Sequence, residues 1–412
     1  MRNNSMRTVA FVSNSDLLGR RFNGFDYRDV LNSFGYGVEY FCFEKSSQLD
    51  FVHPIFPWRY GPKVKGLIDK LEDAISVQSV LYPFPYTLAI QKEFNRSDII
   101  HYQMIHNSFF SLQFLPYLSR KRPSVWSLHD PWALTGHCVH PFSCQKWRNG
   151  CHDCPSLDTP KRLRNDTASL LWEYKRRTIQ DSDITIHVLS DWMKDMIISS
   201  PIMRGKRVQK IPVGLDLTKF TPLKNSKSGP RRSMGIPEDA FVIMLRASKN
   251  PFKGIEIAKE ILSRLNIDRK VVVLTIERKN MLEAIGNNVT VIDQGEVTVD
   301  ELVLSYQISD CLLMTSTAES FGVMGVESMA CGCPVVCLKG TALDQVLGES
   351  KALISIDKGD IDKILEEIKD LSENRARALE MAKASREFVE KRFEINNQVA
   401  SMIRLYEEIL NI

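Results

Sequence analysis

Two glutamates in the C-terminal half of the chain have the spacing and context of a ligand site. Glu319 and Glu327 lie eight residues apart after the apolar run 311–315, which predicts a strand followed by a loop and a helix. Glu319 then falls in the loop and Glu327 about one turn inside the helix, where its carboxylate can accept hydrogen bonds from both hydroxyls of a ribose. Backbone amides at the helix start predict an anion site at Phe321, Gly322 and Val323.

Two basic residues follow another predicted strand in the same half. Arg246 and Lys253 come after the apolar run 241–245 and are seven residues apart. A guanidinium and an ammonium beyond the end of one strand can neutralise a diphosphate from two directions. The pair therefore predicts a diphosphate site that works without a divalent metal, and we expect no catalytic cofactor.

A histidine in the N-terminal half has a comparable position. His129 directly follows the run 125–128, so its imidazole is expected at the end of a buried strand. An imidazole placed there can hydrogen-bond a sugar, and we expect the neighbouring carboxylate of Asp130 to orient the ring.

The loop after the first predicted strand, residues 8–13, contains Gly19, Asn23 and Gly24. Glycine permits a left-handed backbone and close approach to a ligand, and asparagine can adopt the same conformation. We therefore predict that these three residues help to bind the phosphates of a nucleotide.

A cluster of cysteines follows the His129 segment. Four of the nine cysteines lie within 17 residues, and they include a Cys-x2-Cys pair. Such spacing in a reducing compartment favours a structural zinc, with a redox-sensitive disulfide or plain buried thiols as alternatives. The insert 136–155 has little apolar content, so a metal would stabilise it. The predicted ligands are Cys138, Cys144, Cys151 and Cys154.

The elements that must position these residues alternate between strand-like runs and amphipathic stretches, which is typical of α/β folds with parallel sheets. We predict two doubly wound, Rossmann-like domains, 1–212 and 213–393, with a linker near 212–235 and a C-terminal helix, 394–412, packing back on the first domain. Ligands of such sheets bind beyond the strands' carboxyl ends, so the domains should face a central cleft. The predicted strands are 8–13, 38–43, 98–102, 125–128, 184–189 and 208–211, then 241–245, 271–275, 289–292, 311–315, 334–338 and 353–356.

Composition and charge indicate the expected cellular location and partners of the protein. The 412 residues have no apolar run near the roughly 18 needed to span a bilayer, and the N-terminus lacks a signal-peptide pattern, so we expect a cytoplasmic protein. Residues 1–210 contain 28 Lys and Arg against 20 Asp and Glu, which favours peripheral contact with the inner face of a membrane. Nucleic acid is not an expected partner.

Together these motifs resemble the retaining family 4 glycosyltransferases of the GT-B fold. The segment 319–327 is similar to that family's Glu-x7-Glu motif, and Arg246 with Lys253-Gly254 is similar to its diphosphate-binding pair. Residues 211–216 and 291–295 extend the resemblance over essentially the whole chain. The resemblance implies that Glu319 contacts hydroxyls of the donor sugar, that Glu327 holds the ribose, and that His129 faces the sugar.

The resemblance also implies an activity. The expected reaction transfers a sugar from a UDP- or GDP-sugar to a saccharide or lipid-linked saccharide acceptor during synthesis of a cell-surface polysaccharide. Two alternatives stay open: a nucleotide-sugar epimerase on a related fold, and a non-enzymatic binding module that uses the basic N-terminal half and the cysteine cluster. A transferase needs Glu319 and Lys253, whereas a binding module does not.

Overall fold

The chain folds into two compact units. The computed structural model describes residues 6–17, 23–56, 60–282, 285 and 289–411. One unit comprises Met1–Pro212 with Gln398–Ile412, and the other comprises Val213–Asn397. Each unit contains one sheet whose described strand pairs are all parallel, which confirms the predicted α/β class.

The sheet of the first unit has the strand order β3-β2-β1-β4-β5-β6-β7. Its central strands β4, β5 and β6 are buried at every position, as expected for a parallel sheet covered on both faces. The chain first adds β2 and β3 on one side of β1 and then adds β4 on its other side. Folds of this kind bind ligands at the point where the strand order changes direction in this way. The strands are β1 (Arg7–Ser15), β2 (Tyr36–Glu44), β3 (Val52–Pro54), β4 (Ile99–Gln103), β5 (Ser124–Leu128), β6 (Ile184–Val188) and β7 (Val208–Lys210).

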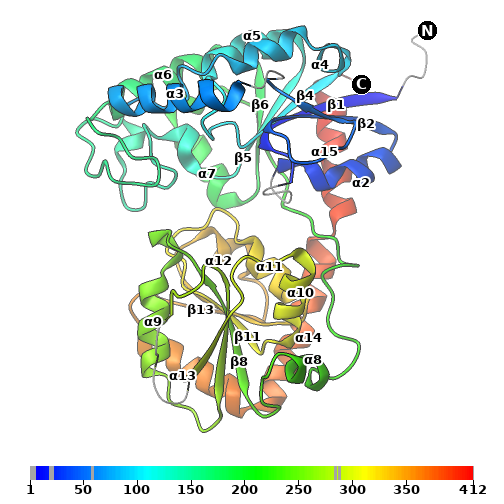
Figure 1. Cartoon of the computed structure of the whole chain (residues 1–412), viewed down its shortest axis with the longest axis vertical. Helices are drawn as coiled ribbons and strands as arrows, with labels where there is room; N and C mark the ends of the chain where they lie inside the picture. Colours follow the sequence, from blue (N-terminus) through cyan, green and yellow to red (C-terminus); the bar gives the residue numbers. More distant parts are fainter. Residues whose placement is uncertain (1–5, 18–22, 57–59, 283–284, 286–288, 412) are drawn as a thin grey trace. The chain divides into compact units, whose positions relative to one another are not determined.

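Helices cover both faces of this sheet, with α5 and α6 on one side and α2 and α15 on the other (Figure 1). The described α-helices are α2 (Arg28–Ser33), α3 (Gly61–Ile75), α4 (Lys92–Arg96), α5 (Leu115–Lys121), α6 (Ala168–Gln180), α7 (Asp191–Ser199) and α15 (Ile395–Ile409). Short 3-10 helices are η1 (Phe25–Tyr27), η2 (Phe84–Ile90), η3 (Leu112–Phe114), η4 (Pro131–Leu134), η5 (Lys146–Arg148) and η6 (Pro201–Met203). None of the helices within the described residues is long and apolar enough to cross a membrane.

The sheet of the second unit has the order β10-β9-β8-β11-β12-β13. Helices α9 and α13 lie on one side of it, and α10 and α11 lie on the other (Figure 1). Its strands are β8 (Phe241–Ala247), β9 (Val271–Glu277), β10 (Val289–Asp293), β11 (Cys311–Met314), β12 (Val335–Leu338) and β13 (Leu353–Ile356). Its helices are α8 (Ser228–Ser233), η7 (Pro251–Lys253), α9 (Ile255–Arg264), α10 (Val299–Ile308), α11 (Val323–Ala330), α12 (Ala342–Leu347), α13 (Ile361–Glu373) and α14 (Arg375–Arg392).

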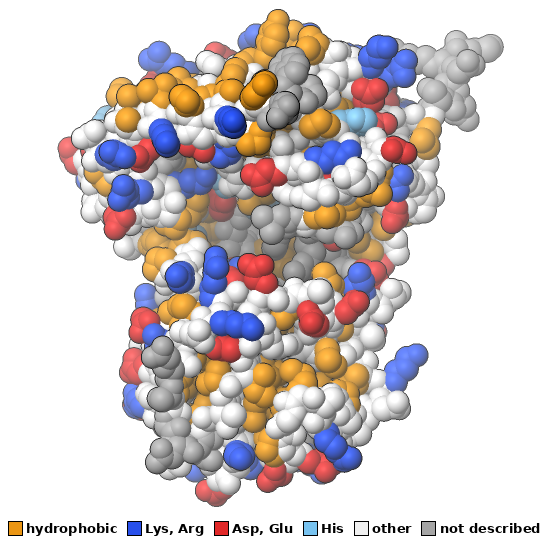
Figure 2. All heavy atoms as spheres, in the orientation of Figure 1, with side chains coloured by type: hydrophobic (Ala, Val, Ile, Leu, Met, Phe, Trp, Pro, Cys, Tyr) orange, Lys and Arg blue, Asp and Glu red, His pale blue; other side chains and the backbone are white. Residues whose placement is uncertain are grey.

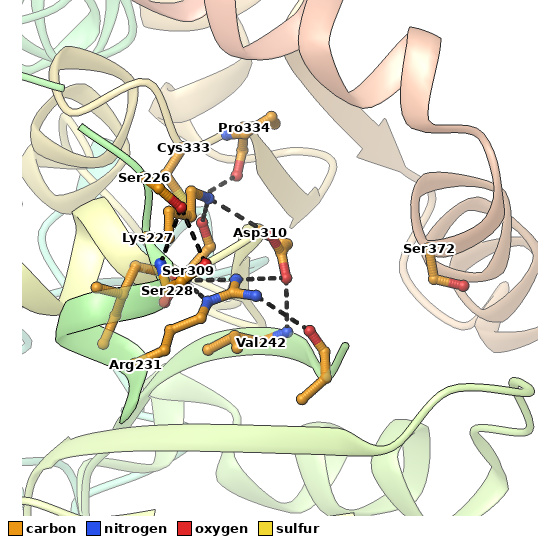
Figure 3. A network of polar contacts seen from close by, with 12 residues as sticks. Ser226, Lys227, Ser228, Arg231, Val242, Ser309, Asp310, Cys333, Pro334 and Ser372 are labelled. Atoms are coloured by element: carbon orange, nitrogen blue, oxygen red, sulfur yellow. Dashed lines mark hydrogen bonds and ion pairs between the residues drawn. The ribbon is translucent and has the colours of Figure 1, made fainter. Parts of the chain in front are cut away.

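The second half of the expected linker is part of the second unit. Arg231 in α8 is 5% exposed, and its guanidinium donates to the carbonyl of Ile308 at 2.7 Å and to Asp310 Oδ2 at 2.8 Å (Figure 3). The same carboxylate accepts a hydrogen bond from the amide of Val242. A buried guanidinium needs such partners, so this polar stretch ties the starts of β8 and β11 together instead of forming a loose connection.

The C-terminal helix α15 contacts the first unit through buried polar groups. Tyr406 is fully buried, and its hydroxyl lies 2.7 Å from His101 Nδ1 on β4. Gln398 Nε2 donates to the hydroxyl of Tyr27 at 2.8 Å. The helix begins at Ile395, three residues after α14 ends at Arg392. Residues near the end of the chain therefore help to hold the centre of the first sheet.

We predict that Tyr406→Phe destabilises the protein by about 1–3 kcal/mol, because it leaves a buried ring nitrogen of His101 without its hydrogen bond. Urea denaturation measures this change. Tyr117→Phe is the matched control, since Tyr117 on α5 is 45% exposed and should change the free energy of unfolding by less than about 0.5 kcal/mol. Equal stability of both variants would contradict the proposed role of α15.

Candidate functional site

An ion pair joins the two C-terminal motifs. Lys253 Nζ lies 2.6 Å from Glu319 Oε1, and both side chains are 14% exposed. Lys253 ends η7 in the loop after β8, and Glu319 lies in the loop after β11. Because β8 and β11 are neighbours in a parallel sheet, their carboxyl ends meet at one edge. Two residues 66 positions apart therefore form one charged site.

Backbone contacts hold these two loops together. The hydroxyl of Thr315 donates to the carbonyl of Lys253 at 3.1 Å, and the amide of Thr317 donates to the carbonyl of Phe252 at 2.9 Å. Gly254 has a φ of 69°, and a Cβ there would lie 2.1 Å from the carbonyl oxygen of Thr315. Glycine is thus required both by its conformation and by the close approach of the second loop.

A second ion pair involves a residue that sequence reasoning missed. Arg246 Nε contacts Glu277 Oε2, and Ser248 Oγ donates to Glu277 Oε1 at 2.6 Å. Burial would raise the pKa of Glu277, but the hydrogen bonds from Ser248 and Arg246 lower it below its ordinary value. Glu277 ends β9, which neighbours β8, with a φ of 84° that is unusual for a residue with a side chain. Its position at a strand end was the available signal.

Three of these charged groups line a small pocket in the second unit. Arg246 and Lys253 contribute two cations, and Glu319 contributes a carboxylate, above a floor formed mostly by β8 and β11. A pocket with two basic side chains at the carboxyl end of a parallel sheet suits an anionic ligand that also carries hydroxyl groups. The other lining residues are Leu245, Leu312, Leu313, Met314, Thr315, Ser316 and Met324.

Glu327 lies apart from this pocket lining. It sits inside α11, is fully buried, and its Oε2 accepts a hydrogen bond from the hydroxyl of Tyr306 on α10 at 2.9 Å. The sequence indicated the helical position but not the packing of α11 against α10. Gly322, with a φ of 86°, begins that helix, and within the described residues no side chain caps it. The amides of Phe321, Gly322 and Val323 are at this helix start.

His129 is held by a different partner from the one we predicted. Its Nε2 lies 2.7 Å from Gln103 Oε1, which projects from the end of the neighbouring strand β4. Asp130 instead pairs with His106 Nε2 at 3.1 Å and accepts from the amide of Trp132 at 2.9 Å. The prediction that Asp130 orients His129 gains no support from these hydrogen bonds, because the carboxylate caps η4 and turns toward His106, although its charge partly offsets the lowering of the His129 pKa by burial.

The contact of His129 continues into a buried polar network. Gln103 Nε2 donates to Ser127 Oγ at 3.1 Å, and Ser127 Oγ lies 2.6 Å from His187 Nδ1 and 2.7 Å from His101 Nε2. Burial lowers the pKa of His129 to about 3, with a further decrease from His187. The imidazole is therefore neutral near pH 7 and suits hydrogen bonding to a sugar rather than proton transfer.

Comparison with known proteins adds an independent line of evidence. Residues 231–388 match the family model described as Glycosyl transferases group 1, and they include Arg246, Lys253, Glu319 and Glu327. This region is a group 1 glycosyltransferase domain. The group 1 domain thus contains every residue that lines the pocket.

Relatives of the whole chain are distant. The chain is 23% identical over 261 residues to the putative colanic acid biosynthesis glycosyl transferase WcaC of Escherichia coli K12, covering 61% of this chain and 62% of WcaC. It is 24% identical over 268 residues to the D-inositol 3-phosphate glycosyltransferase of Geodermatophilus obscurus, covering 61% and 55%. The alignments thus span less than two thirds of each of these two relatives.

Solved structures share the fold of nearly the whole chain. The sucrose-phosphate synthase of Thermosynechococcus elongatus superposes with a TM-score of 0.67 over 98% of this chain and 99% of that one, at 14% identity. HepE of Anabaena, in complex with UDP and glucose, superposes with a TM-score of 0.65 over 98% and 100%, at 15% identity. These likenesses confirm the GT-B fold.

The loop before η1 has a structural role that we did not predict for it. Asn23 is 2% exposed, its Nδ2 donates to the carbonyl of Ser15 at 2.7 Å, and its Oδ1 accepts from the amide of Phe25 at 3.0 Å. A Cβ on Gly24 would lie 2.5 Å from the ring of Phe11. The phosphate role predicted for Asn23 and Gly24 gains no support, because these residues pack inward. Gly19 lies outside the described residues.

The cysteine-rich insert does not show the predicted zinc geometry. All nine cysteines are free thiols, and no three His, Cys, Asp or Glu side chains in the described parts of the chain could hold a metal ion. Cys154 Sγ lies 3.3 Å and Cys138 Sγ 3.7 Å from His137 Nε2, within hydrogen-bond range for sulfur. Cys144 and Cys151 complete the predicted set, and zinc binding by it stays a prediction from the sequence.

Other contacts stabilise this insert. Trp147 is 3% exposed and belongs to the core of the first unit, and its carbonyl accepts from Trp172 Nε1 at 2.8 Å. Within the insert, the amides of Asn149 and Cys151 both donate to the carbonyl of Lys146 at 2.9 Å. The insert thus has an apolar anchor and internal hydrogen bonds, which the expectation of a metal-dependent insert overlooked.

The buried histidines predict a pH dependence of stability. Burial lowers the pKa of His187 to about 4 and that of His101 well below its ordinary value of 6.5. Below pH 6.5 the unfolded chain binds more protons, so the free energy of unfolding should fall toward pH 4, by roughly 1 kcal/mol per pH unit for each histidine. Urea denaturation between about pH 7.5 and about pH 5 tests this expectation. Constant stability over that range would contradict the buried, neutral state.

Proposed function

We propose that the protein is a retaining glycosyltransferase that uses a UDP- or GDP-sugar and no catalytic metal. The observation that carries this proposal is the pocket in which Lys253, Arg246 and Glu319 converge within the group 1 domain. The name of the HepE structure, a complex with UDP and glucose on the same fold, supports a nucleotide-sugar donor.

The two ion pairs suggest how a donor would bind. Lys253 and Arg246 now neutralise Glu319 and Glu277. A donor diphosphate carries more negative charge than either carboxylate, and it would compete for both cations. Lys253 would then stabilise the departing diphosphate, and Glu319 would be released to accept hydrogen bonds from hydroxyls of the sugar. Preorganised cations of this kind stabilise a leaving group without a metal ion.

The remaining roles follow from the family resemblance. Glu327 would hold the ribose, provided that Tyr306 shares or releases its carboxylate. The amides of Phe321, Gly322 and Val323 would add hydrogen bonds to the diphosphate. His129, kept neutral by burial, would hydrogen-bond the sugar.

The proposed acceptor is a saccharide or a lipid-linked saccharide on the cytoplasmic side of a membrane, in synthesis of a cell-surface polysaccharide. The similarity to WcaC, named for colanic acid biosynthesis, supports this setting. The alternatives of an epimerase and a binding module are less favoured, because the relatives named above are called transferases or synthases.

We expect Lys253→Ala to lower kcat/KM for sugar transfer by about 100-fold or more, because it removes a charge that stabilises the leaving group. Lys249→Ala is the matched control, since Lys249 is an exposed lysine of the same loop outside the pocket lining. Transfer from UDP- and GDP-sugars is measured for both variants, with thermal unfolding as the test of folding. Near-normal transfer by a folded Lys253→Ala variant would overturn the assignment.

Retention of configuration is a separate prediction. A donor with an α-linked sugar should yield an α-linked product, which proton NMR of the anomeric signal reports directly. A β-linked product would contradict the retaining mechanism while leaving the transferase assignment intact.

A further inference from the structure

Helix α3 presents an unusual set of residues to solvent. Its exposed positions are all apolar or lysine, although the helix contains three acidic residues. Glu72 is buried, whereas the side chains of Asp69 and Asp73 are partly exposed, at 39% and 40%, and are paired with Lys65 and Arg164. The exposed residues are Pro62, Lys63, Val64, Leu67, Lys70, Leu71, Ala74 and Ile75.

Polar contacts fix this orientation. Glu72 is 4% exposed, and its carboxylate accepts hydrogen bonds from the amides of Ser79, Val80 and Leu81 at 2.7–2.9 Å. Asp69 accepts from the hydroxyl of Tyr82 at 2.6 Å. Rotating the helix to bury its leucines would break these bonds and leave a carboxylate unsatisfied, which is costly. The apolar side is therefore held outward.

The outward apolar side chains form a continuous stripe. Leu67 is 68% exposed, Leu71 52%, Ile75 48% and Val64 38%, and their spacing of three or four residues places them on one side of the helix. Figure 2 shows the hydrophobic side chains as a band along α3, with Lys and Arg side chains beside it. Soluble proteins normally bury such a stripe against their own core.

We propose that the outward face of α3 binds the surface of an anionic lipid bilayer, with the helix lying in the plane of the interface. Over about 22 Å of helix the leucine stripe would enter the boundary between headgroups and acyl chains. Lys63 and Lys70 are exposed on one flank of the stripe, where their ammonium groups would meet lipid phosphates.

Charge favours a bilayer over a second copy of the chain as the occupant. A symmetric pairing of two α3 faces would place Lys63 and Lys70 near their own copies, and the partly exposed carboxylates of Asp69 and Asp73 are already paired with Lys65 and Arg164. An anionic bilayer is complementary to the same pattern, and residues 1–210 carry 28 basic against 20 acidic residues. This inference does not rest on the proposed transfer reaction.

Cosedimentation with vesicles tests the inference. The full-length protein should bind phosphatidylcholine vesicles that contain about 30% phosphatidylglycerol, and bind pure phosphatidylcholine at least about tenfold more weakly. Leu67→Gln with Leu71→Gln should reduce binding to the anionic vesicles by about tenfold or more. Leu379→Gln is the matched control, because Leu379 on α14 of the other unit is 62% exposed. Lys63→Gln with Lys70→Gln should weaken the preference for anionic lipid.

Both leucines are exposed, so the double variant should keep the thermal stability of the parent protein. Unchanged vesicle binding by the folded double variant would overturn the inference. A parent protein that ignores vesicles but forms a dimer in sedimentation velocity, lost in the double variant, would also overturn it and identify a second copy as the occupant.

Discussion

The carboxyl ends of β8 and β11 lie side by side, and the ion pair of Lys253 with Glu319 is the contact through which their loops become one site. Parallel pairing alone brings the two loops to the same edge of the sheet. The carbonyl of Thr315 then approaches Gly254 so closely that a side chain would not fit. The ion pair, the hydrogen bonds and the requirement for glycine all depend on the close approach of the two loops. They therefore act as one constraint.

The first unit positions His129 in a different way. His129 follows a strand, yet it is Gln103 on the neighbouring strand that contacts its ring. Gln103 also contacts Ser127, which lies beside His101, and His101 contacts Tyr406 near the end of the chain. A neutral ring at the strand end therefore depends on groups from β4, β5 and the C-terminal helix, so its position is a property of the whole unit.

Pattern reasoning predicted the sheets better than the contacts within them. Long apolar runs predicted all six strands of the second sheet, whereas β3 escaped because it is three residues long and ends at Pro54. Lys253 and Glu319 could be predicted because each follows a strand, and Arg246 because it lies next to the last residue of β8. The partner of each side chain could not be predicted. Asp130 contacts His106, and Glu277, which was missed, contacts Arg246. Both contacts depend on side-chain directions that residue spacing does not specify.

The orientation of α3 shows the same limit most clearly. A stripe of Val64, Leu67, Leu71 and Ile75 predicts an amphipathic helix, but periodicity is the same whether the stripe faces the core or the outside. The direction is decided by Glu72, which accepts three backbone amides from the segment that follows the helix. Because those amides would otherwise be buried without partners, the carboxylate must face inward. The leucines are exposed as a consequence of satisfying the backbone, and a lipid surface is the environment in which that exposure becomes favourable.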